Sequence, residues 1–291
     1  MMLRITISLI LNIVLYVSVL NAQEIIPFKL NNHYNIIVKA LINEKDSANL
    51  MFQIAMHEAS LSPVRINKVN SVQFDTTEFA EGLSKVNRIQ VANTTIDSIW
   101  IWNNEYSGYE SDGKIGIQLM KGKIFKINYD QSQFELFDKL PTTSDFIPLP
   151  LSIKRGQLFI SIKAILGNQS IPSDFLLQSG FSGALLYSNN FADQHDLENT
   201  LKLLNKTTMS NSAGQKINNL ISLMPKIEID QFMFENVPVN IFTGEIKNQA
   251  NSYIGADLIH RFNWIIDMKS GIAYIQKNKN FNDPYYFKKP N

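Results

Sequence analysis

The stretch FLLQSGFSGALLY, residues Phe175–Tyr187, decides the fold expected for this chain. An apolar run leads into a turn at Ser179-Gly180, and a second apolar run follows after Phe-Ser-Gly. This pattern is typical of a buried strand that delivers a side chain to a tight loop. Gln178 stands where the strand meets the turn. Its amide can donate and accept hydrogen bonds, but unlike a carboxylate it cannot shuttle a proton at ordinary pH.

The chain contains an internal repeat, which predicts its architecture. Each half begins with an alternating strand followed by an apolar strand that enters a loop; the aligned pairs are Ile36–Ile42 with Ile160–Leu166 and Phe52–Ile54 with Phe175–Leu177. This alignment places Ala55 over Gln178, Met56 over Ser179 and His57 over Gly180. We therefore expect two equivalent loops, one in each half.

The later part of each half repeats more clearly. Ile115–Met120 (IGIQLM) aligns without gaps with Ile254–Ile259 (IGADLI), and the same register places Leu136 over Ile275. Each copy reads as a glycine turn, a short helix and a hairpin of two alternating strands. Further short helices are expected after the loops, at Leu61–Val69 and Phe191–Leu204.

Short alternating strands dominate the rest of the sequence, which predicts an all-β fold. Examples are Arg88–Ala92, Ile96–Trp102, Lys226–Ile229 and Val237–Phe242. The proline-containing segment between the halves predicts a linker. The expected organisation is a first lobe at 24–140, a linker at 141–150, a second lobe at 151–278 and a loose tail at 279–291.

The N-terminal segment predicts export. Residues 1–22 consist of a short basic start, the apolar run Ile5–Leu20 and a small residue, Ala22, at the expected cleavage point. This is the pattern of a secretory signal peptide. The alternative is a retained anchor, but the run is shorter than the roughly 20 residues that a spanning helix needs. We expect a periplasmic or extracellular protein without stable membrane insertion.

Composition excludes several classes of function. Lysine and arginine total 27 against 26 aspartates and glutamates, and this balance disfavours nucleic acid as a partner. The sequence contains no cysteine, so disulfides, thiol nucleophiles and thiolate metal sites are excluded. The histidines show no metal-ligand spacing, and we expect no metal and no cofactor.

Taken together, these motifs resemble the retropepsin-like aspartic proteases, in the two-lobed, single-chain form of exported bacterial proteins. In that family an apolar strand enters an Asp-Thr-Gly loop, and two apolar residues and a glycine cross beneath it. Lys114-Ile115-Gly116 and Tyr253-Ile254-Gly255 occupy the crossing positions, and Ile254–Gln276 is similar to the family's lobe-ending helix and hairpin. The resemblance implies two tandem retropepsin- or pepsin-like acid-protease β-barrel lobes, with a short helix in each.

The resemblance also implies a site from which the chemistry has been lost. Family catalysis needs one aspartate from each lobe, and the two share a proton. The sequence offers Ala55 and Gln178 at these positions, so it contains no confident catalytic residue. A shift of the first-lobe alignment to Gln53, Ile54 or Met56 also brings no aspartate.

The residues around the two loops are the candidates for peptide binding, namely Met56, His57, Glu58, Ser179, Gly180, Phe181 and Ser182. An extended peptide can pair with strand edges without any catalytic group. The sequence therefore favours an inactive pseudo-protease that binds a peptide or protein segment between its lobes. Two alternatives stay open: an active peptidase that uses unrecognised groups, and a structural cell-envelope protein without a cleft ligand.

Overall fold

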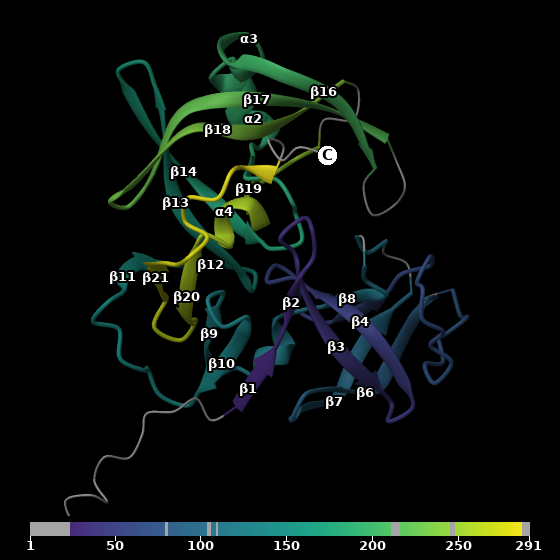
Figure 1. Cartoon of the computed structure of the whole chain (residues 1–291). Helices are drawn as coiled ribbons and strands as arrows, with labels where there is room; N and C mark the ends of the chain where they lie inside the picture. The colour runs from purple at the N-terminus through teal and green to yellow at the C-terminus, as the bar shows by residue number, and fades with distance from the viewer. Residues whose placement is uncertain are drawn as a thin grey trace, which may run out of the picture.

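The computed structural model describes residues 24–78, 81–103, 106–108, 110–210, 216–244 and 248–286. The predicted signal peptide lies outside these residues. Within them, no helix is long and apolar enough to cross a membrane. The architecture is almost entirely β, with two lobes joined by a shared sheet (Figure 1).

The first lobe is a closed barrel. Its sheet has the order β2-β3-β4-β8-β5-β7-β6, and an additional pairing of β3 with β6 closes a ring of six strands. The strands are β2 (Lys29–Leu30), β3 (Ile36–Ile42), β4 (Asp46–Phe52), β5 (Ala59–Leu61), β6 (Leu83–Val91), β7 (Thr94–Trp102) and β8 (Gly113–Ile115). The 3₁₀ helix η1 (Ile117–Met120) follows directly.

The second lobe repeats this topology. Its sheet has the order β12-β13-β14-β19-β15-β18-β17-β16, and β13 pairs with β17 to close the ring. The strands are β12 (Ser152–Lys154), β13 (Gln157–Leu166), β14 (Gln169–Gln178), β15 (Leu185–Leu186), β16 (Lys202–Ser210), β17 (Lys216–Ile229), β18 (Phe232–Thr243) and β19 (Ser252–Gly255). The helices are α2 (Asn189–Gln194), α3 (Leu197–Thr200) and α4 (Ala256–Ile259).

Both barrels contain the same unusual strand order. In the first lobe β4 runs parallel to β8, and in the second β14 runs parallel to β19. A short strand, β5 or β15, then pairs antiparallel with β8 or β19 and parallel with β7 or β18. The expected all-β, two-lobed fold is confirmed, and η1 and α4 are the short helix of each half.

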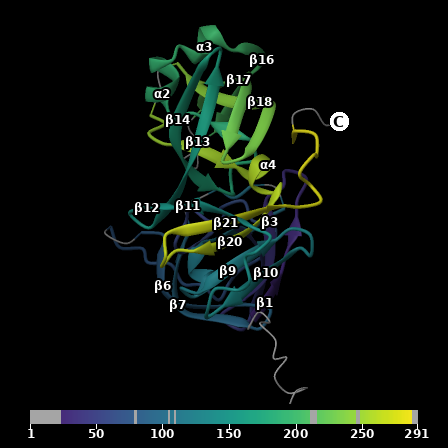
Figure 2. The same cartoon turned by 90° about the vertical axis from the view of Figure 1, so that its left-hand side faces the viewer.

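A six-stranded antiparallel sheet joins the lobes at the base (Figure 2). Its order is β1 (Glu24–Pro27), β10 (Gln133–Phe137), β9 (Ile124–Asn128), β20 (Phe262–Asp267), β21 (Ile272–Lys277) and β11 (Ile147–Pro150). At its centre Lys126 pairs with Ile265, flanked by Ile127 with Trp264 and Phe125 with Ile266. Each half contributes three strands, so an approximate two-fold axis passes through this central pair.

One continuous apolar core runs through both barrels and the shared sheet. The strands alternate as the sequence predicts: β3 buries Ile36, Val38, Ala40 and Ile42 and exposes Lys39 and Leu41. The short β5 is instead buried throughout, because it lies between β7 and β8 inside the barrel. Burial on this scale supplies the stability that a chain without disulfides needs.

Four local predictions differ from the structure. The single helix expected at Phe191–Leu204 is instead the two short helices α2 and α3, and residues 202–204 begin β16. Leu61–Val69 contains no helix, because Leu61 ends β5 and the following backbone turns where Asp112 accepts hydrogen bonds from the Ile66 and Asn67 amides. Residues 147–150 of the predicted linker form β11, whose backbone pairs with β21. Residues 279–286 of the predicted loose tail pack against the second lobe, as described below.

Close packing allows no side chain at Gly116 and Gly255, the two glycines that follow β8 and end β19. A Cβ atom added to Gly255 would lie 2.1 Å from the Gly183 carbonyl oxygen, and one added to Gly116 would lie 2.3 Å from that of Met56. The clashing atoms belong to the backbone of the adjacent loop, so they cannot rotate away. Glycine is therefore required here for space.

We expect Gly255→Ala to destabilise the protein by about 1–3 kcal/mol, the usual cost of overpacking a core. The free energy of unfolding in urea measures the effect. Gly108→Ala is the matched control, because its Cβ would meet only the terminal methyl of Met51, which can move. Equal stability of the two variants would contradict this account of the crossing.

Candidate functional site

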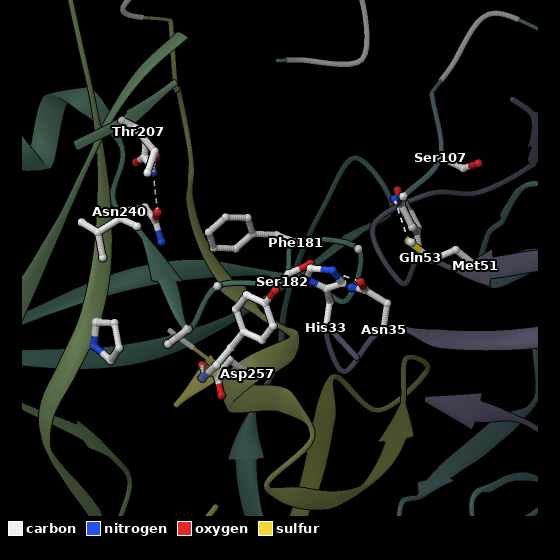
Figure 3. A pocket seen from close by; sticks show the side chains of 18 of the residues that line it. His33, Asn35, Met51, Gln53, Ser107, Phe181, Ser182, Thr207, Asn240 and Asp257 are labelled. Atoms are coloured by element: carbon white, nitrogen blue, oxygen red, sulfur yellow. Dashed lines mark hydrogen bonds between the residues drawn. The ribbon is translucent and has the colours of Figure 1, made fainter. Parts of the chain in front are cut away.

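The candidate site is a cleft of about 560 Å³ between the two lobes. Met51, Gln53 and Lys114 line it from the first lobe, and Phe181 and Asn240 line it from the second. Figure 3 shows the labelled side chains of both lobes facing the same space. The volume lies within the range of roughly 300–1,000 Å³ that is typical of ligand sites.

Two glutamines occupy equivalent positions beside this cleft. Phe52 pairs with Ile115 in the first lobe and Leu177 pairs with Ile254 in the second, so the next residues, Gln53 and Gln178, correspond. The turns after them also match. The Met56 amide donates to the Gln53 carbonyl and the Phe181 amide donates to the Gln178 carbonyl, each at 3.0 Å.

The alignment of Ala55 with Gln178 is therefore wrong by two residues. Ala55 corresponds instead to Gly180, and Ile54 corresponds to Ser179. The apolar residues alone allow the shifted alignment, because the polar residue that ends each run is what fixes the correct one. The signal was present: LMFQ (Leu50–Gln53) and FLLQ (Phe175–Gln178) are both three apolar residues followed by glutamine.

Ser179 connects the two loops across the lobe boundary. Its hydroxyl donates to the Phe52 carbonyl at 2.9 Å and accepts from the Ile54 amide at 3.0 Å. The side chain is 2 % exposed, so both bonds are shielded from water. Ile54 holds the equivalent position in the first lobe and has no hydroxyl, so the connection is made from one side.

Gly180 lies against both glutamines. Its amide donates to Gln178 Oε1 at 3.4 Å, and a Cβ added to it would lie 2.2 Å from Gln53 Nε2. Gly180 thus lies between the two glutamine side chains; Gln53 lines the cleft, whereas Gln178 is not among the lining residues. Gln53 Nε2 also lies 3.9 Å from the Met51 sulfur.

Asn35 fixes the second loop from the first lobe. Its Nδ2 donates to the Ser179 carbonyl at 2.9 Å, and its Oδ1 accepts from the Ser182 hydroxyl at 3.2 Å. Asn31 accepts the Asn35 backbone amide and so holds this residue in place. Asn35 is one of the cleft residues that sequence reasoning missed, because it lies more than 140 positions before the loop it contacts.

The predicted peptide-binding residues divide into two groups. Gly180, Phe181 and Ser182 line the cleft, whereas Ser179 is buried beneath it. Met56, His57 and Glu58 are not among the residues that line the cleft. Glu58 accepts a hydrogen bond from the Trp102 indole at 2.8 Å, and His57 is exposed. Within the described residues, no cluster of three histidine, aspartate or glutamate side chains could hold a metal ion.

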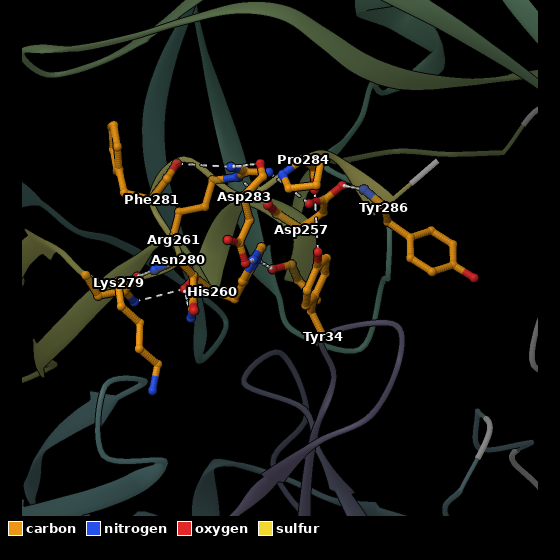
Figure 4. A network of polar contacts seen from close by, with 12 residues as sticks. Tyr34, Asp257, His260, Arg261, Lys279, Asn280, Phe281, Asp283, Pro284 and Tyr286 are labelled. Atoms are coloured by element: carbon orange, nitrogen blue, oxygen red, sulfur yellow. Dashed lines mark hydrogen bonds and ion pairs between the residues drawn. The ribbon is translucent and has the colours of Figure 1, made fainter. Parts of the chain in front are cut away.

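The C-terminal segment 279–286 packs against the second lobe through a network of polar contacts (Figure 4). The buried Arg261 guanidinium donates to the carbonyls of Phe281 and Asp283. Asp257 pairs with Arg261 and accepts the backbone amide of Tyr286, which lines the cleft. Burial raises the pKa of Tyr285, whose ring lies under the same guanidinium, to about 12.

First-lobe residues contact this segment. The Tyr34 ring stacks on the buried His260 ring at 3.8 Å, and its hydroxyl donates to the Pro284 carbonyl at 3.4 Å. The His33 ring lies 4.7 Å from that of Tyr286. These contacts tie the turn before β3 to α4 and to the C-terminal segment. The contact between the lobes is therefore held by these residues as well as by Ser179.

The hairpin of β16 and β17 forms the outer wall of the cleft. In Figure 1 it reaches beyond the rest of the second lobe toward the side of the first. Thr207 from β16 and Asn219 and Ile221 from β17 line the cleft. In the first lobe, the described residues between β5 and β6 form no strand equivalent to β16. The cleft is therefore asymmetric.

Comparison with solved structures supports the fold. An aspartic proteinase from Irpex lacteus superposes with a TM-score of 0.52 at 10% identity, covering 89% of this chain and 98% of that one. Basic 7S globulin from soybean superposes with a TM-score of 0.51 at 7% identity, covering 92% and 98%. No protein-family model and no curated protein sequence matches the chain. The chain therefore has an aspartic-protease-like fold.

Loss of the Ser179 hydroxyl should weaken the contact between the lobes. We expect Ser179→Ala to lower the free energy of unfolding by about 1–3 kcal/mol, because it leaves the buried Ile54 amide without an acceptor. Urea denaturation measures this loss. Ser182→Ala is the matched control, since this half-buried hydroxyl makes one 3.2 Å bond beside the cleft. A loss at Ser182 as large as that at Ser179 would argue against the assigned role.

Proposed function

We propose that this protein is a non-catalytic, aspartic-protease-like protein that binds an extended peptide or protein segment in its interlobe cleft. The observation that carries the proposal is the glutamine pair, Gln53 and Gln178, at the two equivalent strand ends. These are the positions at which the resemblance to aspartic proteases calls for the two catalytic aspartates.

An amide pair does not support aspartic catalysis. That mechanism needs one ionised carboxyl to take a proton from water and one protonated carboxyl to polarise the scissile carbonyl. Gln53 and Gln178 keep the approximate shape of the acid side chains but cannot exchange protons in the required range. Their N–H and C=O groups can instead hold the carbonyl and amide groups of a bound backbone.

The cleft retains features suited to an extended chain. It offers apolar surface from Met51 and Phe181 beside neutral hydrogen-bonding groups from Gln53, Asn35 and Ser182. A site of this composition suits a peptide, whose backbone supplies donors and acceptors and whose side chains alternate between the two walls. The contacts of Ser179, Asn35 and Tyr34 between the lobes hold the walls in place, so little ordering of the protein is needed on binding.

The proposal extends to location and family. We propose that the protein is exported after removal of residues 1–22, is periplasmic or extracellular, and belongs with the retropepsin-like proteins of exported bacterial type. The lobe-ending phrase Ile254–Gln276 supports the family assignment, and the N-terminal pattern supports export. Nucleic acid is not a proposed partner.

Peptide binding tests the main proposal. Purified protein is applied to an array of random decapeptides, and the strongest ligands are measured by fluorescence polarisation. We expect saturable binding that is lost in Ser182→Trp, which fills the cleft, and kept in Ser170→Trp, which adds the same bulk at an exposed position away from it. Absence of any binding, or binding that survives Ser182→Trp, would count against the proposal.

The same peptides test for catalysis. Incubation across pH 3–8 with mass-spectrometric detection should give no pepstatin-sensitive cleavage. Gln178→Asp alone should stay inactive, because one carboxyl lacks its partner; Gln53→Asp with Gln178→Asp is the smallest change that could restore the pair. Cleavage by the unchanged protein that is abolished at Gln53, Gln178 or Ser179 would replace the proposal with an active peptidase.

Export is tested separately by the mass of the protein recovered from its own cells. The mature chain should begin near Gln23 and be found outside the cytoplasm. An intact Met1 terminus in the membrane fraction would indicate a retained anchor instead.

A further inference from the structure

The second-lobe wall of the cleft contains a group of neutral polar side chains on one face of the β16–β18 sheet. Thr207 pairs with Asn219 across β16 and β17, and Ile221 pairs with Asn240 across β17 and β18. Side chains of directly paired residues, and of residues two apart on a strand, share a face of the sheet. All four residues line the cleft.

Three of them form a chain of hydrogen bonds. Asn240 Nδ2 donates to the Leu185 carbonyl at 3.3 Å, and Asn240 Oδ1 accepts from Asn219 Nδ2 at 2.8 Å. Asn219 Nδ2 also donates to the Thr207 hydroxyl oxygen at 3.1 Å. Figure 3 shows Thr207 and Asn240 on the same side of the cleft, opposite Gln53. These hydrogen bonds fix the orientation of the Asn240 and Asn219 side-chain amides.

The chain of bonds ends with one acceptor unused. Asn219 is 2 % exposed, and its Oδ1 accepts no hydrogen bond from any residue that the structure describes. A buried oxygen without a donor is costly, and such groups need an explanation. The half-buried Thr207 hydroxyl accepts from Asn219, and its own hydrogen is available to donate to a ligand. The wall therefore offers one acceptor and one donor on neighbouring atoms.

We propose that this wall is a subsite for the side-chain carboxamide of a glutamine or asparagine in the bound peptide; the inference rests on the function proposed above. The carboxamide N–H donates to Asn219 Oδ1, and its oxygen accepts from the Thr207 hydroxyl. Because Oδ1 is shielded from solvent in this structure, a small movement of the wall accompanies entry of the carboxamide.

The surroundings favour this group over charged ones. Ile221, Pro238 and Phe181 provide an apolar border for the methylenes of the incoming side chain, and every cleft-lining residue that β16, β17 and β18 contribute is uncharged. A carboxylate would bring no hydrogen for Asn219 Oδ1, and an ammonium group would bring no acceptor for Thr207. A carboxamide carries its donor and its acceptor on separate atoms, as the two wall groups require.

The test uses a peptide that the array has shown to bind. Each of its positions is replaced in turn by glutamine, glutamate and methionine, which have similar size and differ in the terminal group. We expect one position at which the peptide with glutamine binds about tenfold more tightly than the peptide with glutamate or methionine. This tenfold difference corresponds to roughly 1.4 kcal/mol. Asn219→Leu and Thr207→Val should each reduce this preference to near unity without changing the other positions.

Asn218→Leu is the matched control, because the neighbouring side chain on the same strand is exposed and lies outside the cleft lining. It should keep the tenfold preference. Thr207→Val changes a half-buried residue to one of the same shape, so it remains informative if Asn219→Leu fails to fold.

The outcomes separate this inference from the proposed function. Peptide binding without a glutamine preference at any position would overturn the subsite and leave the function standing, since backbone contacts alone would then explain affinity. A glutamine preference that survives both Asn219→Leu and Thr207→Val would also overturn it. Absence of peptide binding to the unchanged protein would contradict both the proposed function and the carboxamide subsite.

Discussion

The structure depends on the bridge that Ser179 makes between the two loops. One buried hydroxyl satisfies the Phe52 carbonyl and the Ile54 amide, which belong to the other lobe. The buried Ile54 amide would otherwise have no acceptor, at a cost of about 1–3 kcal/mol. The bridge therefore sets how closely the lobes approach, and this approach sets the width of the cleft.

The rest of the interface compensates for a bridge made from one side only. Ile54, at the equivalent position in the first lobe, has no hydroxyl. The first lobe therefore makes no matching hydrogen bond to the loop of the second lobe. Asn35 supplies a second polar link to the same loop, and the stacked rings of Tyr34 and His260 hold the first lobe against α4. The C-terminal segment completes this side through Arg261. These contacts hold the two walls of the cleft in place although the two loops differ at Ser179 and Ile54.

The cleft combines this rigidity with polar groups that are mostly neutral, since Lys114 and Asp257 are its only charged lining residues among those that the structure describes. Amide side chains line it at Gln53, at Asn35, and along the second-lobe wall at Asn219 and Asn240. Amides carry donors and acceptors together, so they match a peptide backbone or a side-chain carboxamide and offer nothing for proton transfer. The glutamine pair and the amide-lined wall are the features on which the proposed peptide binding rests.

The sequence by itself determined the all-β class, the two-lobed repeat and the absence of an aspartate at the loops. Alternation at Ile36–Ile42 and the ungapped match of Ile115–Met120 with Ile254–Ile259 are local patterns that follow from strand and turn geometry. The partner of Gln178 needed the tertiary structure, because Gln53 is identified by strand register and not by spacing. Asn35, Asn219 and the packed C-terminal segment also came only from the structure, since distant segments meet there through barrel closure and lobe contact.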